Sequence, residues 1–201
     1  MSRSRLDLRR SLEALAFGQS GYFTAAQAME IGYSYQAQKY HVDSGNWTRV
    51  DRGLFRLPNW PAEPTDEYVL WTLWSRSLGV ISQESALRHH GLSDVDPSRV
   101  ILTVPPSFQA KHPLVITHPG DVPAEDAEQH RAWRVTTPLR TLVDIADSDL
   151  SQEHIERAVW DALDLGLLTR RAILRRSAAL EDRAALRLER ALAITEERNG
   201  N

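Results

Sequence analysis

The segment from Ser34 to Ser44 carries side chains that can read nucleic acids. Gln36 and Lys39 fall on one side of a helix that the pattern predicts over residues 35–44. A glutamine amide can pair with the edge of adenine, and a lysine can reach guanine or phosphate. Tyrosine hydroxyls can bond phosphate oxygens. From this segment we expect the following residues to contact DNA: Ser34, Tyr35, Gln36, Gln38, Lys39 and Tyr40.

Arginines stand on both sides of this helix. The β-like runs 47–50 and 54–57 enclose the turn Asp51-Arg52-Gly53, which predicts a hairpin. Arginines on such a hairpin can reach the DNA backbone or the minor groove. We expect these contacts from Arg49, Arg52 and Arg56. A basic arm, or a basic face of the first helix, adds Arg3, Arg5, Arg9 and Arg10.

The same helix allows other interpretations. Gln36 and Lys39 would also suit a face that is merely solvated, and the ring of Tyr40 could pack inward. Gln38 and His41 occupy positions where residues that face the core are mostly apolar. Either the helix is rotated so that Gln38 approaches DNA, or both side chains find partners inside the domain.

Capping signals place these residues on a compact motif. Apolar residues recur at helical spacing from Leu6 to Phe17. Thr24 with Gln27 forms a capping box, and Ser34 is a second N-cap. Gly45 can end that helix in the left-handed conformation. The predicted order is helix, helix, tight turn, helix and hairpin, which is the order of a winged helix-turn-helix.

A proline-rich segment, Pro58–Pro64, is the best domain boundary. We expect a winged helix-turn-helix over 1–60 and a second domain over 65–201. Strand-like runs at 100–104, 114–117 and 133–136 precede a strong helix start at Thr137-Pro138 and three further helices. The expected fold class is α+β, with a mixed α/β second domain that ends in a helical part.

Composition and motifs exclude several chemistries. The sequence has no cysteine, which excludes disulfides, thiolate nucleophiles and cysteine-ligated metals. Phosphate-loop, nucleophile-elbow and dinucleotide fingerprints are absent from it. Its seven histidines show no metal-binding spacing, and His112, His118 and His130 lie in separate segments. We therefore expect no enzyme activity, no metal and no cofactor.

The overall charge of -3 conceals an asymmetry. Residues 1–60 carry a net charge of +3, residues 61–150 a net charge of -6, and residues 151–201 none. A basic N-terminal segment followed by an acidic middle segment indicates different partners for the two parts of the chain. No apolar run approaches the length of a membrane span or a secretory signal, so we expect a cytoplasmic protein without membrane contact.

Two sets of segments carry a resemblance to a known family. The N-terminal stretches are Tyr22–Ala28, Gly32–Ser34, Gly45–Val50 and Arg52–Leu57, spaced without a gap. The later stretches are Ile81–Leu87, His90–Leu92 and Thr137–Asp144. Together they resemble the AbiEi-type antitoxins of abortive-infection toxin–antitoxin systems. The resemblance implies a repressor that binds inverted repeats upstream of its own operon, with possible dimerisation on DNA. It also implies neutralisation of a nucleotidyltransferase-like toxin by the second domain.

Two alternatives to this function stay open. The first is a winged-helix regulator whose second domain binds a small effector or oligomerises, and the second is an enzyme within residues 65–201. For toxin contact, the candidates are Arg140, Asp144, Arg183, Arg187 and Arg190. Each has a structural alternative: Arg140 and Asp144 could pair at i, i+4, and the later arginines could form a solvated face.

Overall fold

The computed structural model describes residues 4–199 and divides the chain into two compact units. Unit 1 contains the described residues up to Leu78 together with Arg131–Trp133. Unit 2 contains the described residues of 79–130 and those from 134 onward. Arg3 lies outside the described residues. The mixed α+β architecture confirms the predicted fold class.

Unit 1 begins with the elements expected of a winged helix. They are α1 (Arg5–Phe17), β1 (Tyr22–Thr24), α2 (Ala25–Ile31), α3 (Tyr35–Asp43), β2 (Thr48–Asp51) and β3 (Leu54–Arg56). The side chain of Thr24 accepts a hydrogen bond from the Gln27 amide, and Gln27 completes the capping box. The antiparallel sheet has the order β1-β3-β2. The short β1 was not predicted, because three residues are too few to show a period.

Between α2 and α3 the chain turns at Gly32, where φ is 126°. A Cβ at this position would lie 2.9 Å from a methyl carbon of Leu8 in α1. Glycine therefore satisfies both the backbone conformation and the close approach of the first helix. Ser34 then caps α3 by accepting from the Ala37 amide, as predicted.

Aromatic rings hold α3 and the hairpin on one core. Phe23 of β1 meets Trp47 edge-on, with ring centroids 4.9 Å apart, and Phe55 of β3 lies 5.7 Å from each of them. All three side chains are buried. Edge-on and offset rings attract one another beyond their burial, so this cluster holds β1 and β3 together. The ring of Trp47 also stacks on His41 of α3, which joins that helix to the cluster.

Unit 1 also includes α4 (Asp66–Trp74), which follows the proline-rich segment and packs against β1 and β3. Arg76 and Ser77 have positive φ, which prevents the helix from continuing toward Leu78. The compact unit thus extends past the proposed boundary. The assignment of separate activities to residues 1–60 and 65–201 stays a prediction.

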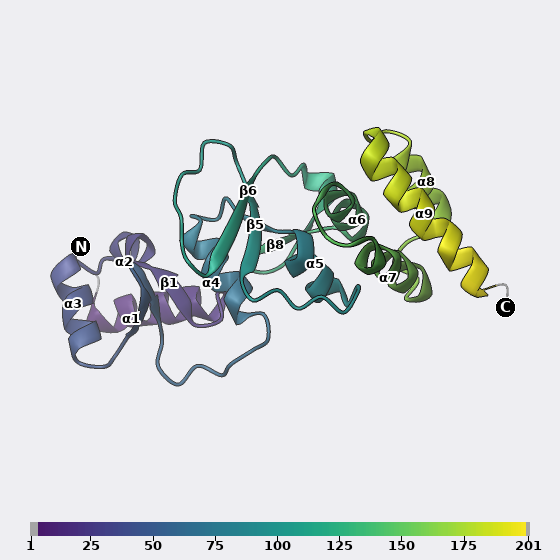
Figure 1. Cartoon of the computed structure of the whole chain (residues 1–201). Coiled ribbons are helices and arrows are strands. Elements are labelled where there is room, and N and C mark those ends of the chain that lie inside the picture. The colour runs from purple at the N-terminus through teal and green to yellow at the C-terminus, as the bar shows by residue number, and fades with distance from the viewer. Residues whose placement is uncertain (1–3, 200–201) are drawn as a thin grey trace. The chain divides into compact units, whose positions relative to one another are not determined.

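Unit 2 is built on a mixed five-stranded sheet of order β6-β5-β4-β8-β7. Its strands are β4 (Val80–Ile81), β5 (Val100–Val104), β6 (Val115–Pro119), β7 (Ala127–Gln129) and β8 (Arg134–Thr136). Helix α5 (Gln83–His90) connects β4 to β5, and the 3-10 turn η1 (Ala124–Asp126) precedes β7. Figure 1 shows β6, β5 and β8 beside one another with α5 near them.

Four helices complete unit 2 beyond the sheet. They are α6 (Pro138–Asp147), α7 (Gln152–Asp164), α8 (Arg170–Ser177) and α9 (Asp182–Asn199). Thr137 caps α6 and Pro138 occupies its first turn, as predicted. The buried faces of α6, α7 and α9 share one core with Leu87 of α5. In Figure 1, α8 and α9 lie side by side at the yellow end of the chain.

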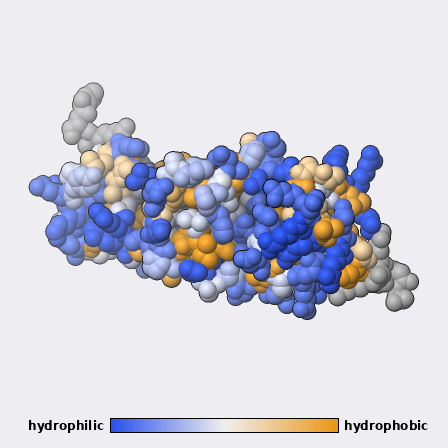
Figure 2. All heavy atoms as spheres, turned by 45° about the horizontal axis from the view of Figure 1, so that its top comes forward, coloured by the Kyte–Doolittle hydropathy of each residue, from blue (hydrophilic) through white to orange (hydrophobic). Residues whose placement is uncertain are grey.

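The visible face in Figure 2 is mostly hydrophilic, including the end of the chain that carries α3. Hydrophobic residues on this face form small groups rather than one continuous sheet of apolar surface. Among residues 4–199, no helix has both the length and the apolar character that crossing a bilayer requires.

Candidate nucleic-acid interface

Helix α3 presents a continuous polar face outside the core. Tyr35 and Tyr40 are 69% and 64% exposed, and Gln36 and Lys39 are also exposed. Lys39 makes only a surface ion pair, with Nζ 2.6 Å from Oδ2 of Asp43 on the next turn. Such exposed pairs contribute little to stability, so the ammonium group can exchange its partner for a phosphate. The structure thus brings four predicted residues onto one accessible face.

Asp43 also lies on this face, and the sequence analysis did not include it. Its side chain is 58% exposed and interacts with Lys39. A carboxylate among the groups that approach DNA opposes the phosphate backbone. The interaction of Asp43 with Lys39 could have been predicted from the sequence, because the two residues are four positions apart on one helix.

Gln38 requires a correction, because it is not on the exposed face. Its side chain is buried, at 3% exposure, and its Nε2 donates to the carbonyl oxygens of Ala25 and Tyr33 at 3.1 and 3.0 Å. These bonds join α3 to the start of α2 and to the turn between the helices. Gln38 therefore fixes the angle between α2 and α3. Its side chain finds partners inside the domain instead of approaching DNA.

We predict that Gln38→Ala lowers the free energy of unfolding by about 2 kcal/mol, because two carbonyl acceptors lose their donor and a cavity forms. Gln36→Ala, an exposed change of the same type on the same helix, should stay within about 0.5 kcal/mol of the wild type. Chemical denaturation of the full chain measures both. Equal effects of the two substitutions would contradict the assigned role of Gln38.

His41 packs inward beside Gln38. Its ring stacks on Trp47 with centroids 4.8 Å apart and planes 15° apart, and Tyr33 meets it edge-on. Burial lowers the pKa of His41 below its ordinary value. The imidazole is therefore neutral at pH 7 and completes the aromatic core under α3. It is not part of the DNA-facing set.

The hairpin of β2 and β3 supplies two accessible arginines. Arg49 is exposed in β2, and its guanidinium lies 5.8 Å from the ring centroid of Phe55. Arg52 is exposed at the turn, whose next residue, Gly53, has a φ of 71°. A bulge between Arg49 and Asp51 interrupts the register of the two strands. These positions suit phosphate or minor-groove contact.

Arg56 also requires a correction, since its guanidinium is occupied within unit 1. It forms an ion pair with Asp66 at the start of α4 and donates to the carbonyl oxygens of Ser20 and Pro61. Its side chain is only 19% exposed and lies over the ring of Tyr22. Arg56 therefore attaches the proline-rich segment to the sheet, and its charge does not face solvent.

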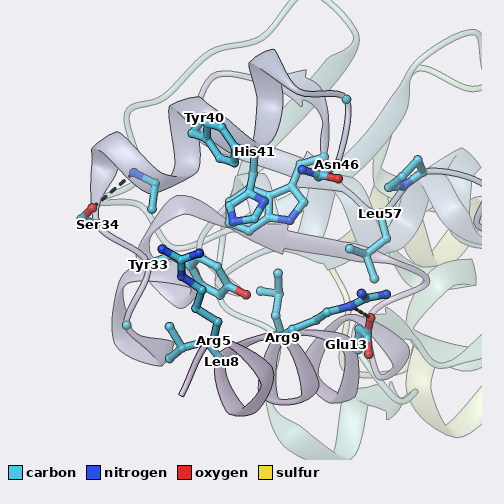
Figure 3. Close-up of a pocket in the computed structure, with 16 residues that line it drawn as sticks. Arg5, Leu8, Arg9, Glu13, Tyr33, Ser34, Tyr40, His41, Asn46 and Leu57 are labelled. Atoms are coloured by element: carbon cyan, nitrogen blue, oxygen red, sulfur yellow. Dashed lines mark hydrogen bonds and ion pairs between the residues drawn. The ribbon is translucent and has the colours of Figure 1, made fainter. Parts of the chain in front are cut away.

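Arg5 and Arg9 of α1 border a pocket of about 990 Å³ that opens between α1 and α3. In Figure 3, Arg5 and Arg9 come from α1, and Tyr40 and His41 come from α3 across the pocket. Arg9 pairs with Glu13 at 2.7 Å, where both side chains are exposed. Arg10 is exposed as well. DNA contact by Arg5, Arg9 and Arg10 stays a prediction.

In unit 2, Arg140 and Asp144 form the i, i+4 pair that was the structural alternative to toxin contact. Arg140 Nε lies 2.7 Å from Asp144 Oδ1, and its Nη1 lies 3.0 Å from Asp126 Oδ2. Arg176 of α8 lies 2.9 Å from the same Asp126 oxygen. Burial raises the pKa of Asp144, and the Arg140 guanidinium opposes that rise. The network joins η1, α6 and α8, so these groups are not displayed for a partner.

The three arginines of α9 differ in exposure. Arg187 is engaged internally and donates to the carbonyl oxygens of Ala146, Ser148 and Leu150. The side chains of Arg183 and Arg190 are 62% and 68% exposed. Each forms an ion pair with an acidic side chain, with nitrogen–oxygen distances of 3.5 and 3.4 Å respectively. Toxin contact by Arg183 and Arg190 stays a prediction, whereas Arg187 stabilises the end of α6.

Sequence comparison addresses the helices and hairpin just described. Residues 10–58 match the protein family described as transcriptional regulator, AbiEi antitoxin. This finding confirms the predicted resemblance to AbiEi-type antitoxins. The AbiEi match runs from α1 through the hairpin, and so contains α3 with its exposed face. No curated protein matches the chain.

A solved structure extends the comparison beyond the AbiEi match. The chain is similar to the RV2827C protein from Mycobacterium tuberculosis, with a TM-score of 0.60 and 16% identity. The similarity covers 97% of this chain and 79% of the other. At this identity the likeness shows a shared fold alone. The fold of both units therefore recurs in another protein that is distant in sequence.

Proposed function

We propose that the chain binds double-stranded operator DNA through the exposed face of α3 and the hairpin. The observation that carries the proposal is the winged-helix arrangement, in which four exposed polar residues of α3 lie in the segment matched to AbiEi regulators. The second helix of such a pair enters the major groove, led by its N-terminal residues. Tyr35, Gln36 and Lys39 would read bases or phosphates there, while Arg49 and Arg52 hold the backbone.

Equilibrium titration of the full chain against DNA tests this proposal. The probe is the segment upstream of the chain's own gene, with a shuffled duplex of equal length as the control. At physiological salt we expect binding to the upstream segment at least about 10³-fold tighter than to the shuffled duplex. An inverted repeat in the bound upstream segment would indicate two copies of the chain per site. Equal affinity for both duplexes would contradict operator recognition.

We further propose that the chain neutralises a nucleotidyltransferase-like toxin through residues 65–201. The support is the antitoxin description of the matched family and the presence of a second unit with its own core. The net charge of -6 over residues 61–150 suits a protein partner better than DNA. The proposal assigns no catalytic reaction to the chain. Expression of a nucleotidyltransferase-like toxin, with and without the chain, tests the proposal through cell growth.

Asp43→Asn should strengthen DNA binding about fivefold, because it removes a negative charge from the α3 face and frees Lys39 from its ion pair. The effect should shrink as salt rises. Fluorescence anisotropy with the upstream duplex measures both. Asp164→Asn, an exposed acidic change at the end of α7, is the matched control and should leave the affinity unchanged. Weaker binding by Asp43→Asn would place DNA elsewhere on unit 1.

A further inference from the structure

Two histidines that are far apart in sequence meet in unit 2. His89 stands in the last turn of α5, and His130 follows β7 directly. Their rings meet edge-on, with centroids 5.1 Å apart and planes 89° apart. Glu128 lies on the same side of the chain as His130, because residues two apart on an extended strand point to the same side. One ligand atom from each of the three side chains lies within 4.8 Å of the other two.

The surrounding contacts hold this cluster in place. The Nε2 atom of the His90 ring lies 2.7 Å from the carbonyl oxygen of Thr136 in β8, and this contact ties the end of α5 to the sheet. Glu128 lies opposite Val135 in the antiparallel pair of β7 and β8. The three ligand-type side chains therefore come from elements already fixed to one another by hydrogen bonds.

We propose that His89, Glu128 and His130 form a binding site for a divalent zinc-class metal ion. Two imidazoles and one carboxylate are an established ligand set for zinc, with a fourth tetrahedral position left for water or another ligand. Bond lengths of about 2.0–2.2 Å place tetrahedral ligand atoms about 3.4 Å apart. The three ligand atoms lie within 4.8 Å of one another, so closing the cluster to that size requires them to approach by up to about 1.4 Å.

The chemistry of the site favours zinc over softer alternatives. Imidazole and carboxylate suit zinc, whereas the chain has no cysteine to select a thiolate-seeking ion. Bound zinc would connect α5 to the β7–β8 hairpin and so stabilise unit 2.

The test is calorimetric titration of ZnCl₂ into the tag-free full chain after treatment with EDTA. We expect one zinc per chain with a dissociation constant below about 1 μM, and a rise in the thermal midpoint with zinc. His89→Gln and His130→Gln should each weaken binding more than about 100-fold, since even outer-shell changes cost 10–100-fold. His118→Gln, an exposed histidine in β6, is the matched control and should keep the wild-type affinity.

A measurement on the wild-type chain keeps the proposal testable if a variant fails to fold. Zinc should shift the imidazole NMR signals of His89 and His130 and leave those of His118 unchanged. Absence of stoichiometric binding at micromolar zinc would overturn the proposal. Undiminished affinity in folded His89→Gln or His130→Gln, or an equal loss in His118→Gln, would overturn it as well. None of these outcomes depends on DNA or toxin binding.

Discussion

Arg140→Ala should lower the free energy of unfolding by about 3–5 kcal/mol. The substitution leaves Asp144, a side chain only 11% exposed, without the guanidinium that lies 2.7 Å away. Removing one partner of a buried ion pair is strongly destabilising because the other charge remains buried. Asp126 keeps Arg176, so the loss falls mainly on Asp144. Chemical denaturation of the full chain, followed by circular dichroism, measures the change.

Two further variants isolate the ion pair. Arg171→Ala removes an exposed arginine from α8 and should change stability by less than about 0.5 kcal/mol. Adding Asp144→Asn to Arg140→Ala should recover part of the lost stability, because the buried charge is removed with its partner. No recovery in the double variant, or equal losses for Arg140→Ala and Arg171→Ala, would contradict the assigned network.

Lys39→Ala combined with Arg52→Ala should weaken operator binding about 100-fold at low salt. The two residues are exposed on different elements, α3 and the hairpin turn, and each offers a charge to the DNA backbone. Each lost phosphate contact should also lower the slope of log affinity against log salt by about one. Fluorescence anisotropy across a salt series measures both quantities on the same protein.

The matched control for this pair is Arg171→Ala with Arg175→Ala, which removes two exposed charges from α8. Overall charge changes equally in the two double variants, so a difference in affinity reports position rather than net charge. Both should keep wild-type stability, since exposed ion pairs contribute little. Unchanged DNA affinity in Lys39→Ala/Arg52→Ala would contradict docking through α3 and the hairpin.

Short-range signals made the DNA-facing motif predictable from sequence. The caps at Thr24 and Ser34 bond to amides three residues away, so their partners are visible in the sequence itself. The exposed face of α3 follows from helical spacing once its cap is known. The family match over residues 10–58 agrees with this part of the prediction.

Long-range pairings account for what sequence could not provide. Arg56 meets Asp66 only because the proline-rich segment folds back onto the sheet, and Gln38 finds its acceptors on two other segments. Three strands and their connecting loops separate His89 from His130, so the spacing of the two histidines carries no metal-binding signature. The strands β4 and β7 were missed because two or three residues show no periodicity.

We propose that operator binding by α3 and the hairpin is separable from toxin neutralisation by residues 65–201. The decisive experiment compares the wild type with Lys39→Ala/Arg52→Ala in cells that hold a reporter behind the upstream DNA and an inducible gene for a nucleotidyltransferase-like toxin. The double variant should lose repression of the reporter and still restore growth. Loss of both repression and growth protection, at equal protein level, would rule out two separable activities.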